Sequence, residues 1–492
     1  MDEIIQALQD SSIYNHEVYQ FSIVETHISW ILLTGLFAYK IKKPVNLGFV
    51  DYSTLAKRKY FCELELVLNK KLAPNLYLDV FPLARKNNKI IFDSKSPPVE
   101  YVIKMHQFDE SQMLNKLCET EGLSKGIVRS LATQIADFHK NTEIAPKGSI
   151  FGTHKNVFQM MLDNFSLLST CNLDAAMEQK IKLIEQWTHE TYTSLHSVLE
   201  QRKEIGHIKA CHGDLHLGNI VLIQGNPTIF DCIEFNDNLR FTDVIADIAF
   251  LAMDLDHKSY HKLSNFFVNH YLELTQDYPG ATLLSFYKAY RAMVRAKICA
   301  IQFSSLEKKD TLLADFTRYL DIAIAYQAKP GSELIITHGP SGSGKSFYTE
   351  ALLETNTLRL SADVFRKQLF HLKPYALSPL SLRSNLYSEK TTKEVYRLLY
   401  EQADYLLSRG FRVIVDATFL KQWQRQQFLQ LSVSHNIPFK ILDFPMNMEL
   451  LKSRIVNKAD PNASDADMEV LRKQLNALEP LTEYEKSFVE VI

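Results

Sequence analysis

The sequence predicts two folded parts in series, an α+β domain with two lobes and then an α/β domain with a parallel sheet. Two observations lead to this prediction. In the first two-thirds of the chain, short strand-like runs around one helical segment precede a long stretch with helical periodicity. In the last third, helix-like and strand-like segments alternate, which is typical of a parallel sheet flanked by helices.

The composition agrees with two or three globular domains, because the chain has 492 residues of which 46% are hydrophobic and 23% are charged. A net charge of −2 provides no electrostatic reason to expect a nucleic-acid partner. The apolar stretch at residues 28–39 is too short to span a bilayer, so we expect no membrane partner. The six cysteines form no C-x-x-C pair and the N-terminus lacks signal-peptide features, which together favour a cytoplasmic protein.

The first lobe, at about residues 1–105, is expected to hold several strands and one helix. The helical pattern runs over residues 54–71 and is stopped by Pro74. A turn is expected at Lys86-Asn87-Asn88-Lys89, because Asn tolerates the backbone angles of tight turns. The predicted strands cover residues 21–24, 30–33, 37–41, 76–82, 90–92 and 101–105.

The second lobe, at about residues 109–328, is predicted to be mostly helical. The stretch Lys329-Pro330-Gly331-Ser332 is the best boundary between domains, so the first domain would cover 1–328 and the second 329–492. In the second domain we expect helices from Lys345 and over about 380–408. The predicted strands there cover residues 333–337, 358–360, 412–415 and 439–442.

One loop carries the chemistry of the first domain: His212-Gly213-Asp214-Leu215-His216-Leu217-Gly218-Asn219, followed by Ile229-Phe230-Asp231. An Asp, an Asn five residues later and an Asp twelve residues after that form a layout used for phosphoryl transfer. Asp214 would be the catalytic base that accepts a hydroxyl proton. Asn219 and Asp231 would bind Mg²⁺, which prefers oxygen ligands. His212 is expected to brace the loop by hydrogen bonding.

A lysine on a strand of the first lobe should contact the ATP phosphates. Lys40 in Ala38-Tyr39-Lys40 is our choice, with Lys42 and Lys43 as alternatives. Its partner should be Glu65 on the following helix, with Glu63 as the alternative. The loop Glu25-Thr26-His27-Ile28-Ser29 lacks glycine, so phosphate contacts there would depend on hydroxyl and backbone N–H groups.

The second domain carries the full G-x-x-x-x-G-K-[ST] motif directly after a predicted strand. Backbone N–H groups of such a loop and of the helix that follows it point at phosphates. Lys345 would reach the β- and γ-phosphates and take part in catalysis, and Ser346 would bind Mg²⁺. The residues expected to hold the nucleotide are Gly339, Pro340, Ser341, Gly342, Ser343, Gly344, Lys345 and Ser346.

Further candidates for this second site lie at strand ends and on helices. Asp416 ends a buried strand and would hold Mg²⁺, unless it is an ordinary strand-end Asp. Asp363 and Arg366 share a face at a helix start, so Asp363 could accept a substrate proton and Arg366 could orient the substrate; the alternative is a helix cap with a solvated arginine. Arg454 and Arg425 are candidates for arginines that close over the nucleotide.

Two groups of charged residues in the first domain allow two interpretations. Asp243 and Asp247 are expected on one helix face, and Arg291, Arg295 and Lys297 form a basic cluster. They would either form a pocket for an anionic substrate or pair with one another between helices.

The His-Gly-Asp-x-His-x-x-Asn motif with the downstream Ile-Phe-Asp resembles the aminoglycoside phosphotransferase branch of the kinase-like fold, which includes choline-kinase-like enzymes. The stretches 25–30, 39–45 and 249–255 resemble a narrower bacterial group, in which such a domain is fused to a C-terminal predicted P-loop kinase of the AAA type. The resemblance covers essentially the whole chain and implies fold and ATP use, but not aminoglycosides as substrates. The group would carry an arginine where this chain has Lys458, which lacks the bidentate fork.

The second domain resembles small P-loop kinases of the zeta-toxin, polynucleotide-kinase and gluconate-kinase type. We therefore expect a phosphotransferase with two modules that uses ATP and Mg²⁺ and phosphorylates a hydroxyl of a small molecule or nucleotide-like acceptor. The alternative is a regulatory protein, in which one module, the kinase-like one first of all, senses a ligand and controls the other. A toxin-like kinase that acts on cell-wall nucleotide sugars is a third possibility, by analogy alone.

Overall fold

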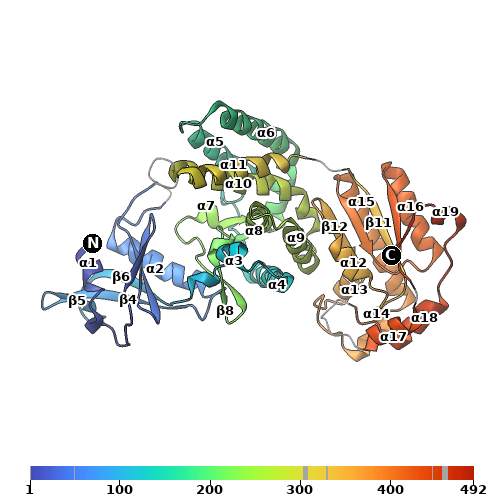
Figure 1. Cartoon of the computed structure of the whole chain (residues 1–492), viewed down its shortest axis with the longest axis horizontal. Coiled ribbons are helices and arrows are strands. Elements are labelled where there is room, and N and C mark those ends of the chain that lie inside the picture. The colour runs from blue at the N-terminus through green and yellow to red at the C-terminus, as the bar shows by residue number, and fades with distance from the viewer. Residues whose placement is uncertain (1, 49, 303–308, 329–330, 446, 457–463) are drawn as a thin grey trace. The chain divides into compact units, whose positions relative to one another are not determined.

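The computed structural model describes the chain apart from residues 1, 49, 303–308, 329–330, 446 and 457–463 (Figure 1). The described residues divide into two compact units: one comprises 1–254 and 286–321, the other 255–285 and 322–492. Of the predicted boundary Lys329-Pro330-Gly331-Ser332, the first two residues lie outside the described residues. Among the described helices, none is long and apolar enough to cross a membrane.

The first unit begins with a six-stranded antiparallel sheet in the order β1-β2-β3-β6-β4-β5. Helix α2 (Leu55–Asn69) packs against β4 and β6, where Cys62 joins a buried core with Ala38 and Ile103. The predicted strands and helix of this lobe are therefore confirmed. The strands are β1 (Ser22–Glu25), β2 (Ser29–Leu33), β3 (Phe37–Lys42), β4 (Tyr77–Lys86), β5 (Lys89–Phe92) and β6 (Pro98–His106), and a short helix α1 (Asp2–Ala7) precedes them.

The turn between β4 and β5 has the predicted position. Asn87 and Asn88 have φ angles of 48° and 60°, so both lie in the left-handed region. Two consecutive left-handed residues match the right-handed twist of the flanking strands, and Asn accepts this backbone conformation better than most residues. The sequence Asn-Asn therefore fixes the register in which Lys86 faces Lys89.

The rest of the first unit is mostly helical, as predicted, and the site loop lies between a short strand and a two-stranded hairpin. Helices α4, α5 and α6 each begin after a Ser, Thr or Asp whose side chain accepts a backbone N–H of the first turn. The first helices are α3 (Leu114–Thr120), α4 (Lys125–Asn141), α5 (His154–Leu168) and α6 (Ala175–Glu204). Later elements are β7 (Ile208–Ala210), β8 (Ile220–Ile223), β9 (Asn226–Ile229), α7 (Asp237–Arg240), β10 (Phe241–Asp243), α8 (Val244–His257), α10 (Leu284–Gln302) and α11 (Lys309–Ala325).

The second unit is built on a five-stranded parallel sheet in the order β12-β13-β11-β14-β15. The prediction of a parallel α/β domain is confirmed, although β15 (Val489–Val491) was not expected. The other strands are β11 (Leu334–His338), β12 (Thr357–Ser361), β13 (Arg412–Asp416) and β14 (Phe439–Asp443). The helices are α12 (Lys345–Ala351), α13 (Ala362–Leu369), α14 (Arg383–Leu386), α15 (Glu389–Ser408), α16 (Gln422–His435), α17 (Met448–Val456), α18 (Met468–Asn476) and α19 (Glu483–Lys486).

An additional helix from earlier in the chain belongs to this second unit. Helix α9 (His261–Thr275) lies beside the edge strand β12 (Figure 1). The buried side chain of Asn269 donates to the carbonyl of Thr357 at 3.0 Å and accepts the N–H of Arg359 at 2.8 Å. Tyr278 donates its hydroxyl to the carbonyl of Arg359 at 3.3 Å. These side chains form hydrogen bonds with backbone groups of β12 that would otherwise be free to pair with another strand.

The turn at Asn87-Asn88 provides a direct test of the sheet. Asn88→Ala should lower the free energy of unfolding by about 1 kcal/mol, because a Cβ-bearing residue without a local hydrogen bond strains the left-handed conformation. Asn88→Gly is the matched control and should be neutral or slightly stabilising. Urea denaturation of the full chain measures both variants. Equal stability of the Ala and Gly variants would contradict the left-handed turn.

Candidate functional site

The loop of residues 212–219 brings the predicted residues Asp214 and Asn219 together. The side-chain amide of Asn219 donates to the backbone carbonyl of Asp214 at 2.9 Å and to Asp214 Oδ2 at 3.2 Å. His216 Nε2 lies 3.4 Å from the same carboxylate oxygen. Burial alone would raise the pKa of Asp214, but the nearby His216, His212 and Arg295 outweigh it and hold this pKa well below its usual range. Asp214 is therefore an ionised carboxylate at neutral pH.

The predicted lysine, glutamate and second aspartate also meet. Lys40 Nζ lies 2.7 Å from Glu65 Oε1 and 2.5 Å from Asp231 Oδ1. Asp231 follows β9 with a φ of 64°, a left-handed conformation that turns the chain sharply at the site. The alternative Glu63 is exposed and lies 3.7 Å from Lys59 instead.

A second buried lysine extends this cluster. Lys42 lies 2.5 Å from Glu65 Oε2 and 2.5 Å from Glu234 Oε1. Tyr52 donates its hydroxyl to Glu234 as well. Burial raises the pKa of Glu65, but the charges of Lys40 and Lys42 lower it to about 2. Lys42, which was predicted only as an alternative to Lys40, therefore helps to keep Glu65 ionised.

The third candidate lysine and the loop between β1 and β2 make contacts outside the cluster around Glu65. Lys43 pairs with the exposed Glu25 at 2.5 Å, away from Glu65. In the loop, the N–H of Ser29 donates to Thr26 Oγ1 at 2.9 Å, and the Thr26 hydroxyl donates to the Ser29 carbonyl at 3.1 Å. The hydroxyl of Thr26 and the N–H of Ser29 are thus engaged with each other.

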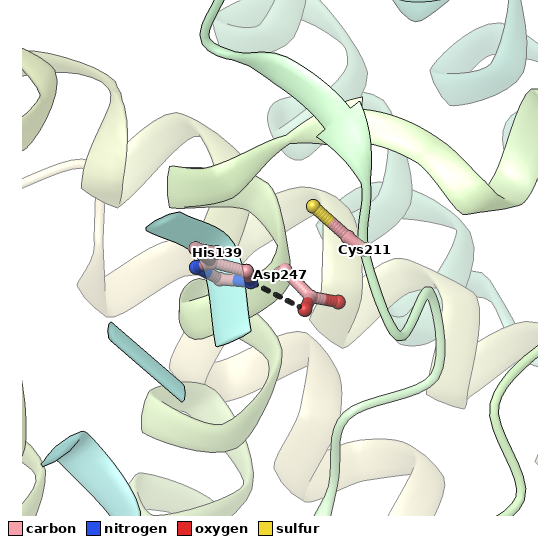
Figure 2. Close-up of side chains that lie close together, drawn as sticks. All are labelled: His139, Cys211 and Asp247. Carbon is pink, nitrogen blue, oxygen red and sulfur yellow. Dashed lines mark hydrogen bonds and ion pairs between the residues drawn. The ribbon is translucent and has the colours of Figure 1, made fainter. Parts of the chain in front are cut away.

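The buried Asp247 lies beside His139 and Cys211, as Figure 2 shows. Asp247 accepts the N–H of Gly213 at 2.9 Å and that of His212 at 3.2 Å, and His139 Nε2 lies 3.0 Å from it. The three side chains are close enough to hold a metal ion. Because both Asp247 oxygens already accept hydrogen bonds, we interpret the cluster as a brace. His139 could not be predicted from the sequence, because it stands in α4 within an ordinary helical pattern.

His212 and Gly213 complete the brace. His212 Nε2 lies 2.8 Å from the carbonyl of Phe230, and His212 Nδ1 accepts the N–H of Asp214 at 3.3 Å, so the expected bracing role of His212 has its contacts. Gly213 has a φ of 85°, and a Cβ there would lie 3.0 Å from the carbonyl of Leu239. Only glycine fits this position without strain.

The other charged residues of the first domain pair separately. Asp243 lies at the end of β10 rather than on a helix and pairs with the buried Arg202 at 2.6 Å. Arg291 donates to the carbonyl of Ala246 at 3.2 Å. Arg295 Nε donates to the hydroxyl of Tyr319 at 3.4 Å. The ion-pair interpretation thus fits Asp243, although its partner lies outside the predicted basic cluster.

In the second unit, the motif at residues 339–346 runs from the end of β11 into the start of α12, as predicted. Gly339, Gly342 and Gly344 have φ angles of 143°, 86° and 99°. A Cβ at Gly339 would lie 3.1 Å from Ser343 Oγ and 3.2 Å from Phe444 Cβ. The Lys345 ammonium donates to the carbonyls of Gly339 at 2.9 Å and Pro340 at 2.7 Å. Burial lowers the pKa of Lys345 to about 8.

Asp416 lies at the carboxyl end of β13, opposite Ser361 of β12. Its Oδ2 is buried and has no hydrogen-bond partner among the described residues. Burial raises the pKa of Asp416, while Arg359, Lys345 and a hydrogen bond to Ser346 lower it. A buried carboxylate oxygen beside a hydroxyl is a donor set that a hard cation fits.

Asp363 and Arg366 lie at the start of α13, as expected. Arg366 Nε is 3.5 Å from Asp363 Oδ1, Arg366 Nη1 donates to the carbonyl of Leu386 at 2.8 Å, and the guanidinium covers the ring of Tyr387. Ser361 rather than Asp363 occupies the N-cap position of this helix. Arg366 is buried, so the alternative of a solvated arginine is wrong.

Of the two remaining candidate arginines, one lies at the glycine-rich loop and the other does not. Arg454 donates to the carbonyl of Gly342 at 3.3 Å and therefore lies at the loop. The prediction that Arg425 closes over the nucleotide is wrong. Its fully buried guanidinium pairs with Glu485 at 2.8 Å and donates to the carbonyl of Phe419 at 3.1 Å. Its role is thus to satisfy buried carbonyls. Lys458 lies outside the described residues.

Two further residues at this site were not among the predicted ones. Gln474 of α18 accepts the N–H of Ser341 at 2.8 Å and donates to its hydroxyl at 3.0 Å. Arg359 of β12 donates to the carbonyl of Ser346 at 3.2 Å. Neither belongs to a local motif, because each reaches the loop only through the tertiary fold.

Fold and site residues together define a two-module chain, with a kinase-like domain followed by a P-loop domain. Residues 334–481 match the family described as AAA domain. Proteins of Mycobacterium tuberculosis and Mycobacterium bovis described as uncharacterised are 30% identical over 448 residues, which cover 91% of this chain and 88% of theirs. The chain belongs to the family of these mycobacterial proteins.

Solved structures with kinase names are also similar to this chain. A choline/ethanolamine kinase family protein from Mesorhizobium loti covers 67% of this chain and 95% of its own, at 13% identity and a TM-score of 0.42. An aminoglycoside phosphotransferase from Alicyclobacillus acidocaldarius covers 64% of this chain and 92% of its own, at 12% identity and a TM-score of 0.37.

The lysine–glutamate cluster has a testable acid dependence. The folded pKa of Glu65 is about 2, below its ordinary value of 4.5, so its ionised form stabilises the fold above pH 4.5. This contribution is lost as the pH falls towards about 2. Between pH 6 and pH 3 the wild-type chain should lose about 2 kcal/mol more stability than Glu65→Gln. Urea denaturation at both pH values measures this difference; equal losses would contradict the assignment.

Proposed function

We propose that the chain is an ATP- and Mg²⁺-dependent phosphotransferase with two nucleotide-binding modules. Each module would transfer the γ-phosphate of ATP to a hydroxyl of a small molecule or a nucleotide-like acceptor. The observation that supports this most directly is the meeting of Lys345, Ser346 and Asp416 at the carboxyl edge of a parallel sheet, where such loops bind phosphates. A cytoplasmic location is part of the same proposal.

In the P-loop module, backbone N–H groups of residues 339–346 would hold the phosphates, and Lys345 would leave the carbonyls of Gly339 and Pro340 to reach them. Ser346 and Asp416 would hold Mg²⁺, which neutralises charge on the phosphates when it is bound. Asp363 would accept the proton of the acceptor hydroxyl while the oxygen of that hydroxyl forms the new bond to phosphorus. Arg366 would orient the acceptor and Arg454 would lie over the phosphates.

In the kinase-like module, Lys40 would be held by Glu65 and would contact the phosphates of ATP. Asn219 and Asp231 would hold Mg²⁺, and Asp214 would take the proton of the acceptor hydroxyl. The bond between the γ-phosphorus and the ADP oxygen breaks as the bond to the acceptor forms. Asp247, through the N–H groups of residues 212 and 213, would keep Asp214 in position.

A second candidate function makes the kinase-like module a regulatory sensor that controls the P-loop module. Two observations favour it. The β1–β2 loop lacks glycine, and the Thr26 hydroxyl and the Ser29 N–H are bonded to each other rather than open to a phosphate. Asp231 is also bonded directly to Lys40, so a metal ion would have to replace this contact. Nucleotide binding without transfer would suit such a site.

ATP turnover of purified wild-type, Lys345→Ala and Asp214→Ala chains separates these functions. Lys345→Ala should reduce the turnover of the P-loop module at least about 100-fold, because it removes a positioned positive charge from the transition state. Asp214→Ala should remove any transfer by the kinase-like module by a similar factor, since it removes the base.

Thr133→Ala, a change on the exposed face of α4, serves as the control and should leave turnover unchanged. If Asp214→Ala leaves every transfer activity intact while nucleotide still binds to the first module, the kinase-like module is a sensor. Full turnover in Lys345→Ala would remove the P-loop module from the proposed chemistry.

A further inference from the structure

Arg359 is a buried arginine surrounded by carboxylates from three elements. Its Nε and Nη2 lie 2.9 Å and 2.6 Å from Glu273 Oε1, and its Nη1 lies 3.6 Å from Glu350 and 4.0 Å from Asp416 Oδ2. The same Nη1 donates to the carbonyl of Ser346 at 3.2 Å. Arg359 thus joins α9 to the phosphate-binding loop and to the strand-end carboxylate.

Glu273 lies outside residues 334–481, the stretch that matches the AAA domain family. It comes from α9, in the segment 255–285 that folds with the second unit. Glu273 is fully buried, and Tyr375 donates its hydroxyl to the second carboxylate oxygen. His270 Nδ1 lies 3.8 Å from the same oxygen. The carboxylate is therefore fixed from several sides and cannot be a mobile surface charge.

The orientation of the guanidinium follows from these contacts. Because Glu273 takes two of its donor atoms, only Nη1 faces Ser346 and Asp416. At 4.0 Å, Arg359 is a charged neighbour of Asp416 without a hydrogen bond to it. Asp416 Oδ2 has no hydrogen-bond partner among the described residues and stays available for a cation.

We propose that Glu273 and Arg359 form a positioning pair for the divalent cation of the P-loop site. Glu273 holds the guanidinium so that it cannot turn and form a bidentate ion pair with Asp416, a pairing that would compete with Mg²⁺. The helix that carries Glu273 is therefore a working part of the P-loop module. This inference rests on the proposed function, in which Asp416 and Ser346 hold Mg²⁺.

The test is the Mg²⁺ concentration that half-saturates ADP binding by the full chain, measured by isothermal titration calorimetry. Only the part of the binding that is lost in Lys345→Ala is counted. Glu273→Gln should raise this Mg²⁺ concentration about fivefold to tenfold, because the released arginine competes for Asp416. If that variant does not fold, Tyr375→Phe replaces it and should raise the concentration about twofold, since it loosens Glu273.

The double variant Glu273→Gln/Arg359→Met distinguishes positioning from simple loss of structure. It removes the competing cation together with its partner, so its Mg²⁺ requirement should return close to that of the wild-type chain. Asn269→Ala is the matched control: it weakens the contact of α9 with β12 without touching the guanidinium. It should lower thermal stability and leave the Mg²⁺ requirement unchanged.

The possible outcomes distinguish failure of the proposed positioning pair from failure of the proposed function. If wild-type ADP binding shows no part that depends on Lys345 and Mg²⁺, both are overturned. If the wild-type chain responds to Mg²⁺ and Glu273→Gln responds at the same concentration, only the positioning pair is overturned. A double variant that is weaker than Glu273→Gln would also overturn the pair, because a structural defect adds with each change.

Discussion

Buried carboxylates that must stay ionised constrain both candidate sites of this protein. Removing a carboxylate from water favours its neutral form, so each needs fixed positive charge nearby. In the first unit Glu65 is shared between Lys40 and Lys42. In the second, Asp416 lies near Lys345 and Arg359. Lys40, Lys42 and Arg359 are each held by a further acid, whereas Lys345 donates to backbone carbonyls.

The backbone around each site is braced by side chains that come from distant parts of the sequence. Asp247 accepts two N–H groups of the loop before Asp214, and His139 supports Asp247. In the second unit Gln474 holds the N–H of Ser341, and Asn269 bonds to the edge of β12. Such bonds fix loop geometry more tightly than the loops could by themselves, which suits a site that works by positioning.

The sequence was sufficient for the architecture and for residues within short motifs. Short strand-like runs and the Asn87-Asn88 turn predicted the first sheet, and a complete glycine-rich motif predicted the loop at Lys345. Residues that act through tertiary contacts could not be predicted. Arg359 and Glu273 are separated by 86 positions, and neither stands in a motif. Arg425 was misjudged, because nothing local reveals that its guanidinium is buried against carbonyls.

The central claim is that one chain carries two separate nucleotide sites. The most direct measurement is the stoichiometry with which a non-hydrolysable ATP analogue binds to the full chain in the presence of Mg²⁺, by isothermal titration calorimetry. We expect two molecules for each chain, one of which is lost in Lys345→Ala and the other in Lys40→Ala. Binding of a single molecule that persists unchanged in either variant would contradict the claim.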